Sequence, residues 1–262
     1  MPTLIITDAN ADDQVRLLRA RLNGHELYGW RGCLKRTTEY GCIEGVQPSD
    51  FLFPRIPRSE WKRLILEGRG TFLSDLTRPV LPPHDQGNTN YCWAHGSVRA
   101  EEAILVYHGQ APKILSAESV AVPLTGGKNR GGSPDEALKR LMSHGCSEQK
   151  FWPENDLNIK HAKEGWIDNA LDHVILRWAD VENFADQMTL ALHRIPVAIG
   201  LNWWGHLVCQ LDPVILPDGS VGIGCDNSWG PDYGENGYFL LDEKHGTADL
   251  GAFAPISTTF AG

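Results

Sequence analysis

Three residues from distant parts of the chain have side chains suited to nucleophilic chemistry. Cys92 follows the loop "QGNTNY", His206 begins the apolar run "HLVCQL", and Asn227 lies in the turn-like segment "DNSWG". A thiol reacts well only when it is ionised, a histidine can accept its proton, and a carboxamide can hold the histidine ring. The three side-chain types therefore predict a cysteine nucleophile with a histidine base and an orienting asparagine.

The position of Cys92 in its helix supports this prediction. Apolar residues recur at helical spacing after Cys92, at Trp93, Ala100, Ala103, Ile104 and Tyr107, so we expect a largely buried helix that begins at the thiol. The exposed N–H groups and partial positive charge of a helix N-terminus stabilise a thiolate. Taken singly, Cys92 reads better as a small buried residue, His206 as a hydrogen-bonded core histidine and Asn227 as an ordinary turn residue. Together they favour the chemical interpretation.

The elements that must position these residues change character along the chain. A first helix is predicted with Val15, Leu18 and Leu22 on one side, and Asn23-Gly24 is expected to stop it. Further helices are predicted over residues 58–68, 92–107 and 133–145, the last with a capping box of Ser133 and Glu136. Short strands are predicted over residues 4–6, 173–178, 196–201, 206–211, 220–225 and 237–241, with one helix over 183–194. Helices first and strands later predict an α+β chain with two lobes.

Several segments resemble those of the papain-like cysteine peptidases. "QGNTNYCWAH", "WGHLVCQL" and above all "DNSWGPDYGENGYFLL" are similar to the family's three site segments, while "ILSAESV" and "NRGGSPDEALKRLMSHG" are weaker matches between them. The resemblance covers about residues 72–243. It implies a papain-like two-lobed fold for residues 71–262, with a helical lobe and an antiparallel, β-barrel-like lobe. Residues 1–70 would form an extra N-terminal extension of unknown role.

The resemblance also implies a role for each catalytic position. Cys92 would be the nucleophile, His206 the general base and then acid, and Asn227 the group that orients His206. Gln86 would donate its amide to the oxyanion together with the Cys92 backbone N–H, and the loss of one such donor typically costs ~3 kcal/mol. In the resting site the family holds a thiolate and an imidazolium.

Further positions are implied to shape substrate binding. Trp229 would shield the bond from Asn227 to His206, and the backbone of Gly131 and Gly132 would hold an extended substrate strand. His206 follows Cys92 by 114 positions, fewer than the roughly 130–150 of the family, so a loop before the histidine is shortened. That shortening would leave Trp203 and Trp204 at the rim, and Leu207 would line the main specificity pocket.

Four departures from the family pattern carry information. Thr89 and Asn129 stand where the family has the two cysteines of a disulfide, which fits a reducing compartment. Tyr91 replaces a small residue beside the nucleophile, and His95 replaces the usual aromatic after "CWA". The last two changes are expected to alter the shape of the entrance.

Composition excludes several classes of function. The net charge of -9 argues against nucleic-acid binding, and no apolar stretch approaches a membrane span. The six cysteines are scattered without the C-x-x-C pairs that would indicate zinc, so we expect no metal and no cofactor. The expected partner is a peptide or protein substrate. Lacking a signal-like leader, the chain is expected in the cytoplasm, with a virus particle as the alternative location.

Two other functions stay open at this point. The chain could be a structural or assembly component, for example of a virus or phage particle, that reuses the fold with vestigial or maturation-only activity. The long extension, through which it would contact a larger assembly, and the bulky Tyr91 leave room for that alternative. A third possibility keeps the nucleophile but makes the substrate a peptidoglycan cross-bridge or another amide. The intact set Cys92, His206, Asn227 and Gln86 favours a cysteine peptidase.

Overall fold

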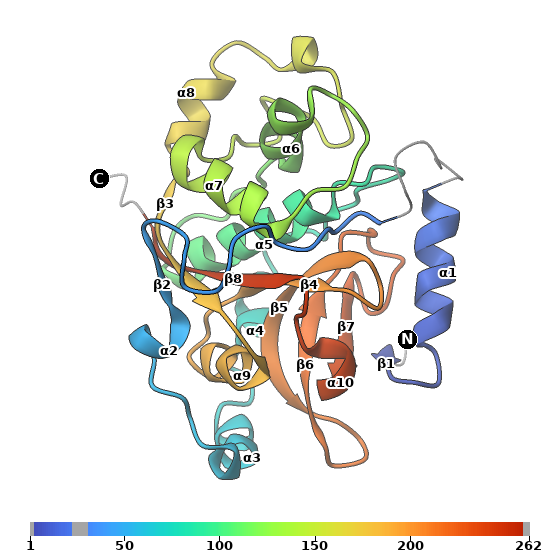
Figure 1. The fold of residues 1–262 in the computed structure, drawn as a ribbon, viewed down its shortest axis with the longest axis vertical. Coiled ribbons are helices and arrows are strands. Elements are labelled where there is room, and N and C mark those ends of the chain that lie inside the picture. Colours follow the sequence, from blue (N-terminus) through green and yellow to red (C-terminus); the bar gives the residue numbers. More distant parts are fainter. Residues whose placement is uncertain (1–2, 23–30, 259–262) are drawn as a thin grey trace.

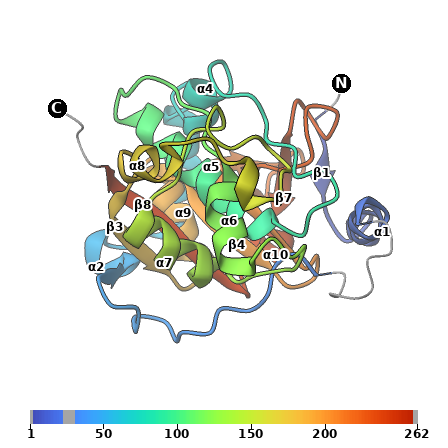
Figure 2. The same cartoon turned by 90° about the horizontal axis from the view of Figure 1, so that it is seen from above.

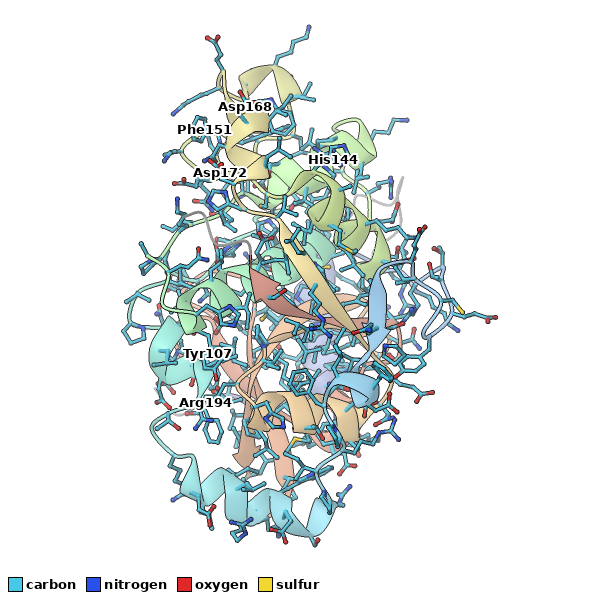
Figure 3. All side chains as sticks on the ribbon, turned by 90° about the vertical axis from the view of Figure 1, so that its left-hand side faces the viewer. Tyr107, His144, Phe151, Asp168, Asp172 and Arg194 are labelled. Carbon is cyan, nitrogen blue, oxygen red and sulfur yellow. The ribbon has the colours of Figure 1, made fainter. Side chains whose placement is uncertain are left out.

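Two lobes and a long N-terminal segment make up the protein (Figure 1). The computed structural model describes residues 3–22 and 31–258. Buried apolar residues form two hydrophobic clusters, one centred on the helices and one on the sheet. In Figure 3 the labelled Phe151 and Asp168 mark the outer end of the helical lobe, and Arg194 lies on the sheet lobe. Among the described residues, no helix combines the length and apolar character needed to cross a membrane.

The helical lobe is built around the helix that begins at the predicted nucleophile. Its elements are α5 (Cys92–Tyr107), α6 (Ala117–Thr125), α7 (Pro134–His144), a 3-10 helix (Ile159–His161) and α8 (Trp166–Leu171). The predicted capping box of α7 is present, because the Ser133 backbone N–H donates to Glu136 Oε2 at 2.8 Å. Helix α5 is buried from Cys92 to Leu105, as its apolar pattern predicts.

The second lobe is a sheet whose central strands are antiparallel. Its strands are β3 (Ile175–Val181), β4 (Val197–Leu201), β5 (His206–Ile215), β6 (Val221–Asp226), β7 (Tyr238–Asp242) and β8 (Gly251–Thr258). The order β7-β6-β5-β4-β8-β3 gives five antiparallel pairs. Helices α9 (Phe184–Leu192) and α10 (Glu243–Gly246) belong to this lobe. Of these six strands, all except β8 were predicted from the sequence.

The N-terminal segment supplies both edges of the sheet. Its elements are β1 (Ile5–Ile6), α1 (Ala11–Arg21), β2 (Val46–Pro48), α2 (Ser49–Leu52) and α3 (Arg58–Glu67), and α4 (Leu73–Thr77) follows. Strand β1 pairs parallel with β7, and β2 pairs parallel with β3, which completes eight strands. The expected stop at Asn23-Gly24 lies outside the described residues. Within the described residues, β1 and β2 of the N-terminal segment are thus edge strands of the same sheet.

Candidate active site

Cys92 and His206 begin neighbouring elements of the two lobes. The first residue of α5 is Cys92, and the first residue of β5 is His206. Both side chains are fully buried. The backbone N–H groups of Leu207, Trp93 and Cys92 itself face the sulfur. Since Leu207 directly follows His206, the thiol lies against the strand that carries the predicted base.

The imidazole of His206 is held from one side only. Its Nε2 lies 2.8 Å from Asn227 Oδ1, and that oxygen also accepts the Ser228 backbone N–H at 2.8 Å. The Nδ1 of His206 has no hydrogen-bond partner among the described residues. Because an amide oxygen can only accept, Nε2 carries the proton and Nδ1 carries the lone pair. The nitrogen that could accept a proton is thus the one not bound to Asn227.

Tryptophan rings enclose the pair of His206 and Asn227. The Trp229 and Trp204 rings lie with centroids 5.0 and 4.8 Å from that of His206. Trp204 is fully buried, and its Nε1 donates to the Gln14 carbonyl of α1 at 3.1 Å. The expected rim position of Trp204 is therefore wrong: helix α1 covers this ring. Trp203 is only partly buried and stacks on Trp204 at 5.1 Å.

Gln86 is fixed beside the start of α5 by three hydrogen bonds. Its Nε2 donates to the Thr89 carbonyl at 2.6 Å, and its Oε1 accepts the Ser228 hydroxyl at 2.7 Å. Its backbone N–H donates to the Ser228 carbonyl at 2.9 Å. An amide nitrogen carries two hydrogens, so one N–H of Gln86 is left for another acceptor.

Asn129 replaces the missing disulfide with hydrogen bonds. Its Oδ1 accepts the Asn90 backbone N–H at 2.6 Å, and its Nδ2 donates to the Asn88 carbonyl at 3.0 Å. All six cysteines are free. A side-chain amide thus ties down the loop before the nucleophile without oxidation.

Tyr91 does not crowd the site entrance. Its ring is fully buried, and its hydroxyl lies 2.9 Å from Thr125 Oγ1 and donates to the Lys128 carbonyl at 3.0 Å. Thr125 is a buried residue of α6, and Lys128 follows that helix. The expectation that Tyr91 reshapes the entrance is wrong, because the side chain points into the core.

A segment of the chain itself lies along the predicted substrate strand site. We call residues 31–36 the strap; in Figure 1 it is the blue segment that crosses in front of α5. The Cys33 N–H donates to the Gly205 carbonyl at 2.9 Å and the Leu34 N–H to the Gly132 carbonyl at 3.0 Å, while the Gly132 N–H donates to the Gly32 carbonyl at 3.1 Å. The backbone predicted to hold a substrate strand therefore holds the strap.

Gly32 rests directly on the sulfur of Cys92. A Cβ added to Gly32 would lie 2.5 Å from Cys92 Sγ, and one added to Gly131 would lie 2.4 Å from the Arg31 carbonyl oxygen. Real Cβ atoms do not approach other heavy atoms so closely. Glycine at both positions therefore lets the strap backbone seat against the nucleophile.

Leu207 is packed inward, away from solvent. It is fully buried, and its Cδ2 would lie only 2.3 Å from a Cβ on Gly96. The side chain fills the contact between β5 and α5 within the first hydrophobic cluster. Leu207 therefore fixes the spacing of the two elements that carry Cys92 and His206.

Burial beneath the strap opposes charge on both reacting groups. Burial raises the pKa of Cys92 to about 12 although three backbone N–H groups lower it, and burial lowers the pKa of His206 to about 4 although Asn227 raises it. Both shifts favour a neutral thiol and a neutral imidazole. The ion pair implied by the family resemblance is thus disfavoured while the strap is in place.

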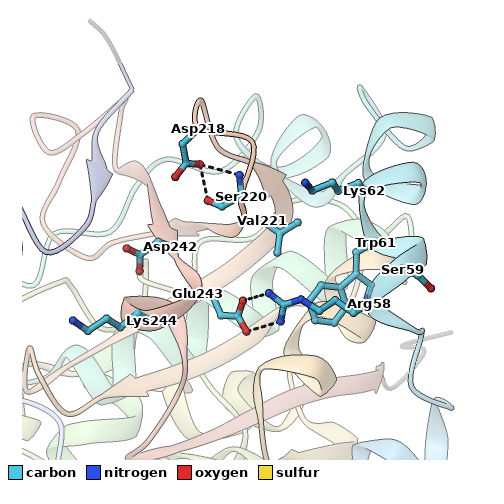
Figure 4. A pocket seen from close by; sticks show the side chains of 10 residues that line it. All are labelled: Arg58, Ser59, Trp61, Lys62, Asp218, Ser220, Val221, Asp242, Glu243 and Lys244. Atoms are coloured by element: carbon cyan, nitrogen blue, oxygen red, sulfur yellow. Dashed lines mark hydrogen bonds and ion pairs between the residues drawn. The ribbon is translucent and has the colours of Figure 1, made fainter.

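A surface pocket elsewhere in the fold lacks this chemistry. It has a volume of about 510 Å³ and lies between α3, the β5–β6 turn and α10 (Figure 4). Two of its lining charges pair, since Arg58 donates to Glu243 at 2.8 Å. None of the predicted site residues lines it.

Several residues of the strap contact were not singled out from the sequence. Gly32 and Asp135 are the main ones: Asp135, at the start of α7, accepts the Thr37 hydroxyl at 2.6 Å and the Thr38 hydroxyl at 3.0 Å. The carboxylate of Asp180 also accepts two hydrogen bonds from Arg36. No periodic pattern marks residues 31–41, so only the pair "RG" at the start of the strap hinted at a special backbone requirement.

Comparison with known proteins finds similarity to cysteine proteases. No family profile matches the chain. Cysteine protease 1 of Oryza sativa subsp. japonica is 27% identical over 203 residues, which are 66% of this chain and 40% of that protein. The chain thus spans about two fifths of the length of this curated relative.

Solved structures show the same fold at low sequence identity. Xylellain, a cysteine protease from Xylella fastidiosa, is 19% identical with a TM-score of 0.58, covering 86% of this chain and 99% of that one. Digestive procathepsin L 3 of Tenebrio molitor larval midgut is 15% identical with a TM-score of 0.59, covering 95% of this chain and 90% of that one. The predicted two-lobed fold is confirmed. The chain has the papain-like fold of these cysteine proteases and is similar in sequence to Cysteine protease 1.

Proposed function

We propose that the protein is a cysteine peptidase that hydrolyses peptide bonds through a Cys92 acyl-enzyme, and that the strap keeps it latent. The observation that carries the proposal is the oriented imidazole. His206 Nε2 lies 2.8 Å from Asn227 Oδ1, which leaves Nδ1 without a hydrogen-bond partner among the described residues. The next residue of the same strand, Leu207, directs its backbone N–H at the Cys92 sulfur. An oriented base next to a cysteine at a helix N-terminus is the arrangement that acyl transfer requires.

The reaction proceeds through an acyl-enzyme, and Asn227 holds His206 in place throughout. His206 Nδ1 takes the proton of Cys92, and the thiolate attacks the substrate carbonyl. The free Gln86 N–H and the Cys92 backbone N–H stabilise the oxyanion. When the intermediate collapses, the imidazolium gives its proton to the leaving amine. Water then attacks the acyl-enzyme with His206 as base, which releases the acid and restores the thiol.

The substrate class follows from the strap. The main-chain groups of Gly132 and Gly205 bind an extended backbone, so a peptide or protein segment in extended form can replace the strap on the same hydrogen bonds. These bonds read the main chain and not its side chains. Leu207 and Trp204 are fully buried, so they do not select among the side chains of a substrate in this structure.

Latency is supported by sterics, electrostatics and comparison. Gly32 occupies the space next to Cys92 Sγ. Burial of the site raises the pKa of Cys92 and lowers the pKa of His206, so both groups are neutral. The match to a procathepsin covers 95% of this chain, so it extends into residues 1–70. Withdrawal of the strap would let water reach the site, remove the burial that raises the Cys92 pKa and free the substrate strand position.

The contacts of the extension favour this role over an assembly role. Residues 31–36 bind to Gly132, Gly205 and Asp180 of the same chain, and β1 and β2 complete its own sheet. Six free cysteines and the Asn129 clamp support a reducing location such as the cytoplasm.

The first prediction concerns the reacting residues. A peptidyl epoxide should label Cys92 once the strap is displaced, and Cys92→Ala should abolish labelling. His206→Ala should lower kcat/KM by ~10²–10⁴-fold, because the base is lost, while the fold stays intact. The exposed His161 provides the matched control, and His161→Ala should keep full activity. Mass spectrometry of the labelled peptide and steady-state kinetics check these outcomes; equal rates for His206→Ala and His161→Ala would remove His206 from the mechanism.

The second prediction concerns latency. Gly32→Val should displace the strap, since its Cβ would lie 2.5 Å from Sγ, and should raise the rate of Cys92 labelling at least several-fold. Lys35→Ala changes an exposed strap residue and should leave the rate at the wild-type value. Circular dichroism confirms that both variants are folded. If Gly32→Val is labelled as slowly as wild type, the proposed latency is wrong, while the role of Cys92 as nucleophile is unaffected.

The third prediction concerns pH. Burial alone would raise the pKa of Asp135, but hydrogen bonds from Ser133, Thr37 and Thr38 hold it near about 2. A carboxyl whose pKa is lowered by a contact stabilises that contact above its free pKa of ~3.9 and loses it as pH falls toward 2. The strap anchor should therefore weaken between about pH 4 and pH 2.

Hydrogen exchange at the Cys33 and Leu34 amides measures this weakening, because both are bonded within the groove. Asp135→Ala should expose these amides already at neutral pH. The control is Asp218→Ala, which removes another carboxyl of lowered pKa, in an exposed turn. Protection of Cys33 that is equal in all three proteins from pH 7 to pH 2 would show that Asp135 does not anchor the strap.

A further inference from the structure

Two buried histidines next to the site have no part in the proposed reaction. His84 lies two residues before Gln86, and His95 lies one helical turn after Cys92 in α5. Their exposed fractions are 4% and 1%. The two Nδ1 atoms are 3.1 Å apart, with the rings at 89° to each other.

The opposite nitrogen of each ring faces a buried carboxylate. His84 Nε2 lies 3.0 Å from Glu102 Oε2, and His95 Nε2 lies 3.5 Å from Glu118 Oε1. A carboxylate accepts hydrogen bonds, so it favours the tautomer with the proton on Nε2. Both Nδ1 atoms then present lone pairs to each other at 3.1 Å. A metal ion bound by both atoms removes this repulsion. The alternative is a proton on the Nδ1 of His95, whose Nε2 makes no hydrogen bond among the described residues, so that His95 donates to His84.

A third donor makes a metal ion the better fit. One ligand atom from each of His84, His95 and Glu154 lies within 4.8 Å of the others. Zinc binds imidazole nitrogen at ~2.0–2.1 Å and carboxylate oxygen at a similar distance, and two nitrogens 3.1 Å apart can both reach one such ion. Carboxylates behind ligating histidines are the usual outer partners of zinc sites, and Glu102 and Glu118 occupy those positions.

The surroundings suit a cation that enters from solvent. Glu154 is only half-buried, so it opens the cluster to the outside. The guanidinium of Arg99, which lines the same small cavity as the two histidines, is paired with Asp226 at 2.7 Å and with Glu102 at 3.1 Å. A cavity of about 10 Å³ adjoins both histidines and Asn227, which is space for about one water molecule.

We propose that His84, His95 and Glu154 bind one divalent transition-metal ion of the zinc class, with water in the fourth position. The ion is structural. It ties the loop that carries Gln86 to helix α5 and to the segment around Glu154, and so fixes the oxyanion donor relative to the nucleophile. No metal was expected from the sequence, because the chain lacks C-x-x-C pairs. That absence says nothing about a site made of histidines and a carboxylate.

The test must exclude zinc binding at the catalytic thiol, so the full chain carries Cys92→Ala throughout. After dialysis against EDTA, titration calorimetry with Zn²⁺ should give one site per chain. Zinc at about 100-fold above its dissociation constant should raise the melting temperature by roughly 5–10 °C. Co²⁺ should give visible d–d bands without a sulfur charge-transfer band.

Variants then assign the site. His84→Ala should abolish the calorimetric signal and the cobalt bands, and Glu154→Gln, a change at a half-exposed position that leaves the core intact, should weaken binding at least tenfold. The matched control is His161→Ala, which removes an exposed histidine 2.9 Å from Asp156 and should bind like the parent. If Zn²⁺ leaves the melting temperature of the parent unchanged, a proton fills the gap and the proposal is wrong. Undiminished binding by Glu154→Gln overturns it equally.

Discussion

A buried ion pair between the lobes sets the geometry on which the site depends. Arg99 of α5 lies 2.7 Å from Asp226 at the end of β6, and both side chains are buried. Burial alone would lower the pKa of Arg99, but Asp226 and Glu102 outweigh it and raise the pKa. Removing one partner of such a pair leaves an uncompensated buried charge, which typically costs ~3–5 kcal/mol. Because Asp226 directly precedes Asn227, the pair fixes the helix of the nucleophile relative to the residue that orients its base.

The proposed latency depends on the same geometry, because the strap lies on both lobes at the site. Its backbone bonds to Gly132 and Gly205 would serve any extended chain, and the specific element is Gly32, which alone among residue types lets the backbone rest on Sγ. The seal also removes water, and loss of water is what shifts the Cys92 pKa upward and the His206 pKa downward. Steric exclusion and suppression of the ion pair therefore have one cause, and both end when the strap leaves.

The sequence predicted the parts of the protein whose signals are local. Cys92 at a helix start, His206 at a strand start and the Ser133 capping box all depend on patterns within a few residues, and the structure has each of them in place. Strand β8 was missed because "GAFAPIST" is interrupted by Pro255 and rich in small residues.

Trp204 and Tyr91 were misplaced for a different reason. The side on which a side chain lies depends on its partners, here Gln14 of α1 and Thr125 of α6, which no local pattern identifies. The strap was not predicted, because it is held largely by main-chain hydrogen bonds, and these do not require particular residue types.

The polar residues His95, Arg99 and Glu102 of α5 show that residue types alone do not identify a site. His95, Arg99 and Glu102 lie on one side of the helix, a spacing normally read as a solvated face, yet all three are buried. Burial forces each group to find a partner, because an unpaired buried polar group is costly. Arg99 finds Asp226, Glu102 finds His84, and His95 is left with a nitrogen that faces another nitrogen. That unmet requirement, more than the presence of histidines, points to a bound cation at this position.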